Sequence, residues 1–149
     1  MNTSEMKALF DTYVDAANRH DGELQMSCMD ERCFFENIPL ASRVEGKQAV
    51  DAQYQLVLQA FPDYGREIEI VLADDDVLAA SWRLRGTLRG HLMGQEPTGR
   101  AINVPIVSVL TFKDGLIEGE RILYDIATLC AQAGLNVAAV RSAAGLAPA

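Results

Sequence analysis

The sequence predicts a single α+β domain in which a curved antiparallel sheet wraps around helices to form a cone. Two amphipathic helical patterns occupy much of the first 60 residues, and nearly everything from residue 66 to residue 125 is strand-like. Helices followed by consecutive strands are typical of a sheet with helices on one face. Because a strongly twisted sheet around a long helix encloses space, the same fold predicts an internal pocket for a ligand.

The helices are predicted from apolar residues that recur at every third or fourth position. The predicted segments are 4–19, 22–29, 47–60 and 126–133. Asn2 or Ser4 can cap the first of them, and Pro62 ends the third because the residue before a proline avoids helical geometry. Gly134 ends the fourth. The Ala-rich tail at 136–149 follows, so we expect the core of the domain to span about residues 4–135.

The strands are predicted from alternating apolar residues between turn signals. The predicted segments are 32–38, 66–73, 76–88, 101–113 and 116–125. Pro39 stops the first strand, and three successive aspartates from Asp74 separate the second from the third. Asp114-Gly115 between apolar alternations is a strong hairpin signal. The last four strands should therefore form an antiparallel meander.

Composition excludes several classes of partner. The net charge of −8 over 149 residues argues against nucleic acid and anionic membrane surfaces. No apolar run approaches the ~18 residues that cross a bilayer, and the N-terminus lacks the pattern of a secretion signal, so we expect a cytoplasmic protein. Cys28, Cys33 and Cys130 form no close pair, and no metal site is expected from them.

Six short motifs follow one another along about residues 5–135. They are Ala60-Phe61-Pro62-Asp63, Gly86-Thr87, Pro97-Thr98-Gly99-Arg100, Phe112-Lys113-Asp114-Gly115-Leu116-Ile117, Tyr124-Asp125 and Gln132-Ala133-Gly134-Leu135. In this order and spacing they resemble the SnoaL-like polyketide cyclases, or ester cyclases, of the cystatin-like, nuclear-transport-factor-2-like fold. The resemblance implies a homodimer with no metal and no organic cofactor. It also implies that Asp125 acts as general acid/base in an intramolecular aldol closure.

Asp125 has two possible roles. In an apolar pocket, lost hydration would raise the pKa of its carboxyl, which could then take a proton from a carbon between two carbonyls. Alternatively, Asp125 directly precedes the predicted helix at 126–133, and aspartate is among the best N-caps. The resemblance favours a role in the pocket, and strand parity would place Arg121 and Leu123 on the same face as Asp125 and Glu120 on the other.

Two positions depart from the pattern of the resemblance. Leu88 stands where many relatives have a histidine after Gly-Thr, and His91 follows three residues later, in a loop or on the surface unless Gly90 allows a bulge. Arg121 lies four residues, roughly 13 Å along a strand, from Asp125. A guanidinium that reached Asp125 would lower the pKa of its carboxyl, or it could bind a substrate carbonyl or carboxylate instead.

The other predicted pocket residues are mostly apolar or aromatic. They are Tyr13, Cys33, Phe35, Asn37, Tyr54, Trp82, Leu84, Leu88 and Leu123, together with His91 and Arg121. Tyr13 and Tyr54 could orient a ligand oxygen through their hydroxyls, or could be core aromatics. Asn37 could donate a hydrogen bond that polarises a carbonyl, or could be a turn residue before Ile38-Pro39.

The leading functional hypothesis is a cofactor-independent cyclase that acts on a small apolar carbonyl compound or polyketide-like ester through Asp125. One alternative is a non-catalytic module that holds an apolar metabolite in the same cone. Another is a hydrolase or isomerase in which Asp125 activates water, with Arg121, Tyr54 and Asn37 as its available polar partners.

Overall fold

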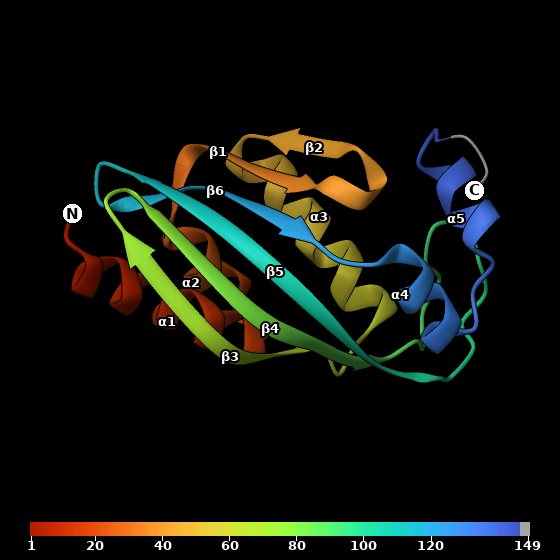
Figure 1. Ribbon diagram of the computed structural model, residues 1–149. Helices are drawn as coiled ribbons and strands as arrows, with labels where there is room; N and C mark the ends of the chain where they lie inside the picture. The colour runs from red at the N-terminus through yellow and green to blue at the C-terminus, as the bar shows by residue number, and fades with distance from the viewer. Residues whose placement is uncertain (147–149) are drawn as a thin grey trace.

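The computed structural model describes residues 1–146, in which six strands form one curved, open sheet with five α-helices (Figure 1). The helices are α1 (Thr3–Asn18), α2 (Gly22–Ser27), α3 (Lys47–Ala60), α4 (Ile126–Ala133) and α5 (Val137–Ala143), with a 3-10 turn η1 (Ile38–Leu40). The strands are β1 (Met29–Asn37), β2 (Ser42–Glu45), β3 (Gly65–Asp74), β4 (Val77–Thr87), β5 (Ala101–Lys113) and β6 (Leu116–Leu123). The predicted α+β class is confirmed.

The strands are ordered β2-β1-β6-β5-β4-β3 across the sheet. The antiparallel meander of β3 to β6 agrees with the prediction, but β1 pairs with β6 in parallel, so the sheet is not wholly antiparallel. A parallel pair needs a long connection rather than a tight turn, and here the whole of α3 and the meander supply it. The short strand β2, which the sequence did not predict, covers the free edge of β1.

The helices occupy the inside and the two ends of the curved sheet. In Figure 1, α1 and α2 lie at one end, α4 and α5 lie at the other, and α3 runs inside the curve. Helix α1 contacts β3, α3 contacts β1, and α4 contacts β5. The capping box at Asn2 and Glu5 fixes the start of α1, because each residue's side chain accepts a hydrogen bond from the other's backbone N–H.

Alternate residues of β5, from Ile102 to Phe112, are buried and line the inner face of the sheet. Thr111 lies opposite Gly119 and Phe112 lies opposite Ile117, so Glu118 is an extra residue that forms a β-bulge in β6. Since side chains alternate with a period of two, one extra residue moves all later side chains to the other face. The bulge therefore decides which residues of β6 face the interior.

Glu120 and Ile122 face the interior beyond this bulge, opposite Leu110 and Ser108 of β5. Parity correctly put Arg121 and Leu123 on one face and Glu120 on the other, but the prediction that the face of Arg121 and Leu123 lines the pocket was wrong. Arg121 and Leu123 point to the outer face of the sheet.

Candidate functional site

Two neighbouring cavities lie inside the curve of the sheet. The outer cavity has a volume of about 800 Å³ and extends between α3, α4, α5 and the ends of several strands. The inner cavity, about 80 Å³, lies deeper, between α1, α2, α3 and the inner face of the sheet. Five residues line both: Phe35, Val57, Leu84, Ile106 and Ile122. The two cavities are therefore adjacent and share part of their walls.

The wall of the outer cavity is mostly apolar. Leu129 and Cys130 of α4 and Val140 of α5 contribute to it, so the C-terminal part of the described chain forms one side. The polar side chains in this wall are Asn37, Ser42, Arg43, Gln53, His91 and Tyr124. An apolar cavity with a few polar groups is the usual form of a site for a small organic molecule.

Asn37 and Tyr124 form a fixed pair in this wall. The Tyr124 hydroxyl donates to Oδ1 of Asn37 at 3.1 Å, and the backbone N–H of Leu40 donates to the same oxygen at 3.4 Å, which caps η1. Because a backbone N–H can only donate, the atom that faces Leu40 is the amide oxygen. The Nδ2 group of Asn37 therefore remains available as a donor, since it has no partner among residues 1–146.

Arg66 of β3 and Glu120 of β6 form a buried ion pair beside the inner cavity. Nη1 of Arg66 lies 2.8 Å from Oε2 of Glu120, and Nη2 lies 3.2 Å from Oε1. The two side chains are only 3% and 0% exposed. This geometry is bidentate, which is the favourable arrangement for a guanidinium and a carboxylate.

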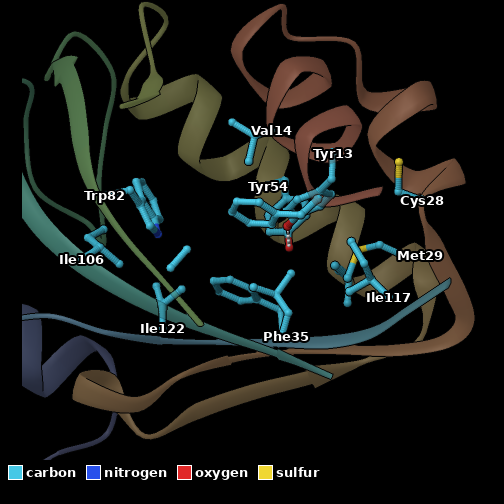
Figure 2. Close-up of a cluster of buried hydrophobic side chains, with 14 of the residues drawn as sticks. Tyr13, Val14, Cys28, Met29, Phe35, Tyr54, Trp82, Ile106, Ile117 and Ile122 are labelled. Carbon is cyan, nitrogen blue, oxygen red and sulfur yellow. Dashed lines mark hydrogen bonds between the residues drawn. The ribbon is translucent and has the colours of Figure 1, made fainter. Parts of the chain in front are cut away.

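Hydroxyl groups satisfy the remaining acceptor positions of Glu120. The Tyr13 hydroxyl donates to Oε1 at 2.7 Å, and the Ser108 hydroxyl donates to Oε2 at 2.8 Å. The hydroxyls of Tyr13 and Tyr54 lie 2.6 Å apart, and Figure 2 shows them pointing toward one another. The indole N–H of Trp82 donates to Ser108 at 2.8 Å. The carboxylate is thus held on both oxygens.

This network decides the charge states of its members. Burial alone would raise the pKa of Glu120, but the Arg66 charge and the hydrogen bonds from Arg66, Tyr13 and Ser108 outweigh it and lower that pKa. Burial, with the Glu120 charge, raises the pKa of the Tyr13 phenol well above its ordinary value. Burial likewise raises the pKa of Tyr54. Glu120 is therefore ionised and both phenols are neutral, which suits structural roles better than proton transfer.

Asp125 lies outside both cavities and two residues beyond the end of β6. It is the N-cap of α4: its Oδ1 accepts from the N–H of Ala127 at 3.0 Å, and its Oδ2 accepts from the Thr128 hydroxyl at 2.9 Å. The hydrogen bond from Thr128, followed by that from Ala127, lowers the pKa of this exposed carboxyl. The expected apolar surroundings and raised pKa of Asp125 were therefore wrong, and the capping geometry is present.

Arg121 does not reach Asp125, one of the two roles considered for it, and it lines neither cavity, so its prediction as a pocket residue was wrong. Its guanidinium lies over the ring of Phe34, 4.6 Å from the centroid, and its Nε lies 3.4 Å from Glu36. The ring of Phe34 covers Gly119, where an added Cβ would come within 2.3 Å of it. Leu123 is 52% exposed on the same outer face. The bulge at residue 118 accounts for both positions.

The other predicted residues fall into three groups. Phe35, Tyr54, Trp82 and Leu84 line the inner cavity. Figure 2 labels three of them, with Trp82 across from Tyr54 and Phe35. Asn37 and His91 line the outer cavity; His91 is largely exposed, and its Nε2 lies 3.3 Å from Glu96. Tyr13, Cys33 and Leu88 are buried core residues that line neither cavity.

Arg66, Glu120 and Ser108 were not among the predicted site residues. Ser108 was the available signal, because it is a polar residue at an inward position of the apolar run from Val104 to Phe112. Arg66 and Glu120 lie 54 residues apart. Each occurs in a strand that also carries exposed charges, and neither shows locally that it is buried.

Within residues 1–146, no three or more His, Cys, Asp or Glu side chains gather as they would around a metal ion. The same part of the chain contains no helix that is long and apolar enough to cross a membrane.

Comparison with known proteins agrees with this architecture. The model of one family, described as SnoaL-like polyketide cyclase, matches residues 7–133. AclR from Streptomyces galilaeus, a candidate hydroxylase, is 25% identical with a TM-score of 0.78, over 89% of this chain and 98% of AclR. A candidate SnoaL-like polyketide cyclase from Jannaschia sp. CCS1 is 20% identical with a TM-score of 0.81, over 89% and 94% of the two chains. IdmH from Streptomyces antibioticus, a candidate polyketide cyclase, is 20% identical with a TM-score of 0.74, over 87% and 98%. No curated protein matches the chain.

Proposed function

Because the chain belongs to the SnoaL-like polyketide cyclase family, we propose that it closes a ring in a small, largely apolar carbonyl compound bound in the outer cavity. The volume of about 800 Å³ suits such a molecule, since ligand sites commonly measure roughly 300–1,000 Å³. The observation that carries the proposal is the free amide donor of Asn37 in this otherwise mostly apolar wall.

Asn37 would act on the carbonyl that becomes the electrophile. Tyr124 and the N–H of Leu40 hold its oxygen, so the Nδ2 group is oriented without the substrate. A donor fixed in advance stabilises the negative charge that develops on the carbonyl oxygen during attack. In the ring closure the enol carbon bonds to the polarised carbonyl carbon, and one proton moves from carbon to the new alkoxide. No group leaves, so substrate and product have the same mass.

Two side chains are candidates for the proton transfer. Asp125 is the candidate of the family resemblance, but both of its oxygens already accept hydrogen bonds and the lowered pKa of its carboxyl makes it a weak base. His91 lines the outer cavity, and the carboxylate of Glu96 lies 3.3 Å from its Nε2. An imidazole that lines the cavity can take a proton and return it. The geometry thus favours His91.

A pair of conservative substitutions tests this assignment. We expect His91→Gln to lower the rate of ring closure by about 10²-fold or more, the usual contribution of a general acid/base. We expect Asp125→Asn to leave the rate and the melting temperature unchanged, because asparagine caps helices as well as aspartate does. The substrate in this assay is an aromatic ester that carries a ketone side chain and an acidic CH₂ group between two carbonyls. Its conversion is followed by the change in absorbance and in chromatographic retention time.

The opposite pattern would reassign the base. A rate abolished in Asp125→Asn at an unchanged melting temperature, with His91→Gln still active, would make Asp125 the acid/base group and His91 a surface residue. Tight binding without conversion in the unaltered protein would contradict ring closure and support the non-catalytic binding module. One observation favours that alternative: both carboxylate oxygens of Asp125 already accept hydrogen bonds from its own helix.

We also propose that two copies of the chain pair through the outer face of the sheet. Ile70, Ser81, Val107 and Leu123 lie side by side across four strands, and the three apolar members of this row are exposed. Exposed apolar patches of this kind mark interaction sites. The net charge of −8 makes two copies repel each other, and this row adds no carboxylate to an interface.

Val107→Glu is expected to convert the dimer to a monomer, because it places a carboxylate at the centre of this row, where the second copy would bury it. Light scattering coupled to size-exclusion chromatography measures the mass. Leu56→Glu alters an exposed apolar residue on α3, 56% exposed against 43% for Val107, and serves as the control, which should stay dimeric. A dimer that survives Val107→Glu would place the interface elsewhere.

A further inference from the structure

The inner cavity has polar lining that the proposed ring closure does not use. Gln25 of α2 lines it and is 7% exposed. Its side-chain amide has no hydrogen-bond partner among residues 1–146. The Gln25 amide is not among the fully buried polar atoms without a partner, so it reaches open space, and Gln25 lines the inner cavity. A ligand group in the inner cavity would provide the missing partner.

Arg66 offers a second donor at the same cavity. Its five N–H groups have as partners the Tyr64 hydroxyl, both oxygens of Glu120 and the Tyr13 hydroxyl, which leaves one hydrogen on Nη1 without a partner in the described chain. Trp82 holds the guanidinium in place, with its ring 4.6 Å away. Arg66, Trp82 and Gln25 all line the inner cavity.

The charge of the site selects the class of group that fits. Glu120 already neutralises Arg66, at 2.8 Å and with both side chains buried. A carboxylate placed in the inner cavity would therefore add an uncompensated buried charge, which is strongly unfavourable. A neutral carbonyl oxygen can instead accept from Gln25 or Arg66. The carbonyl oxygen of the Gln25 amide can accept from an N–H or O–H group if the ligand has one.

The size and position of the cavity limit the group to a short one. A volume of about 80 Å³ exceeds what one water needs but is smaller than an engineered cavity of about 150 Å³ that binds benzene. Five residues line both cavities, so the two cavities are adjacent, and a molecule that displaced part of this shared wall would reach from the outer into the inner.

We propose that the inner cavity binds the neutral carbonyl end group, a short ester, ketone or amide, of an apolar molecule whose body occupies the outer cavity. This inference rests on the proposed function in one respect only, namely that the apolar body of the molecule lies in the outer cavity. The end group is bound here and does not react, because the reacting carbonyl lies at Asn37 in the outer cavity.

Three naphthalenes of matched size test the subsite: methyl 2-naphthoate, 2-naphthoate and 2-propylnaphthalene. Trp82 is the single tryptophan of the chain and lines the inner cavity, so its fluorescence reports occupancy there. We expect the ester to bind about tenfold more tightly than the hydrocarbon, because only the ester satisfies the buried polar groups. The carboxylate should bind more weakly than the ester by at least as much.

Gln25→Leu should remove most of the preference for the ester and leave the affinity for the hydrocarbon unchanged. Gln53→Leu makes the same substitution in the wall of the outer cavity and should leave the preference intact. Equal affinities for ester and hydrocarbon in the unaltered protein would overturn the subsite, even where Gln25→Leu does not fold. So would failure of all three probes to bind. In either case the ring-closure assay still decides the proposed function separately.

Discussion

Glu120→Ala is expected to lower the free energy of unfolding by about 3–5 kcal/mol, the usual cost of removing one partner from a buried ion pair. The substitution leaves the guanidinium of Arg66 buried and without its carboxylate. It also removes the acceptor of the Tyr13 and Ser108 hydroxyls. Since domains of this size are stable by only about 5–15 kcal/mol, much of the stability would be lost. Urea denaturation followed by circular dichroism measures it.

Glu67→Ala is the matched control, because it removes one partner of an ion pair between β3 and β4, Glu67 with Arg85, that is about half exposed. Exposed pairs contribute about 0–1 kcal/mol, so this variant should stay close to the unaltered protein. Replacing both Arg66 and Glu120 with leucine should recover part of the loss, since no charge is then left unpaired. Similar small losses in Glu120→Ala and Glu67→Ala would show that Arg66 and Glu120 are not paired in a buried network.

Asn37→Asp is expected to lower kcat for ring closure by about 10²–10³-fold, the effect of removing one fixed donor from a developing oxyanion. Aspartate is nearly the same size and still accepts from the N–H of Leu40 and from the Tyr124 hydroxyl. The fold should therefore be unchanged, while the donor is replaced by a negatively charged oxygen. The melting temperature and the single-turnover rate are measured together.

Tyr124→Phe separates positioning from direct contact. It removes the hydrogen bond that orients Asn37 but leaves the Nδ2 group in place, and the Leu40 N–H still holds the amide oxygen. We expect kcat of Tyr124→Phe to fall by about tenfold, which is a smaller loss than that expected for Asn37→Asp. An Asn37→Asp variant as active as the unaltered protein would exclude Asn37 from the reaction.

Much of the fold could be predicted because its signals are local. The helical periodicity near Tyr13 and Tyr54, and the turn at Asp114-Gly115, are visible within a dozen residues, and the elements lie close to where they were expected. Asp125 shows the limit of such signals. Its position before a helix indicated an N-cap, whereas the family resemblance indicated a catalytic residue in a pocket. Only the residues that surround Asp125 in space distinguish these two roles.

The inner face of β6 could not be predicted from the sequence. The extra residue at Glu118 leaves no mark in the pattern of apolar residues, yet it turns Glu120 inward and Arg121 outward. An inward charged residue such as Glu120 is favourable only when an oppositely charged side chain is buried beside it. Its partner, Arg66, is far away in sequence. The choice of the face of Arg121, Leu123 and Asp125 as the inner one came from the family resemblance and was wrong, and the buried network beside the inner cavity was missed with it.

The parallel pairing of β1 with β6 also has a consequence for how the chain folds. Phe35 pairs with Glu120, so the chain between them must be made before this part of the sheet can form. Contacts between residues distant in sequence slow folding, and the edge of β1 stays open during synthesis until β6 emerges. We therefore expect the nascent chain to depend on chaperones until late in translation, when β6 emerges.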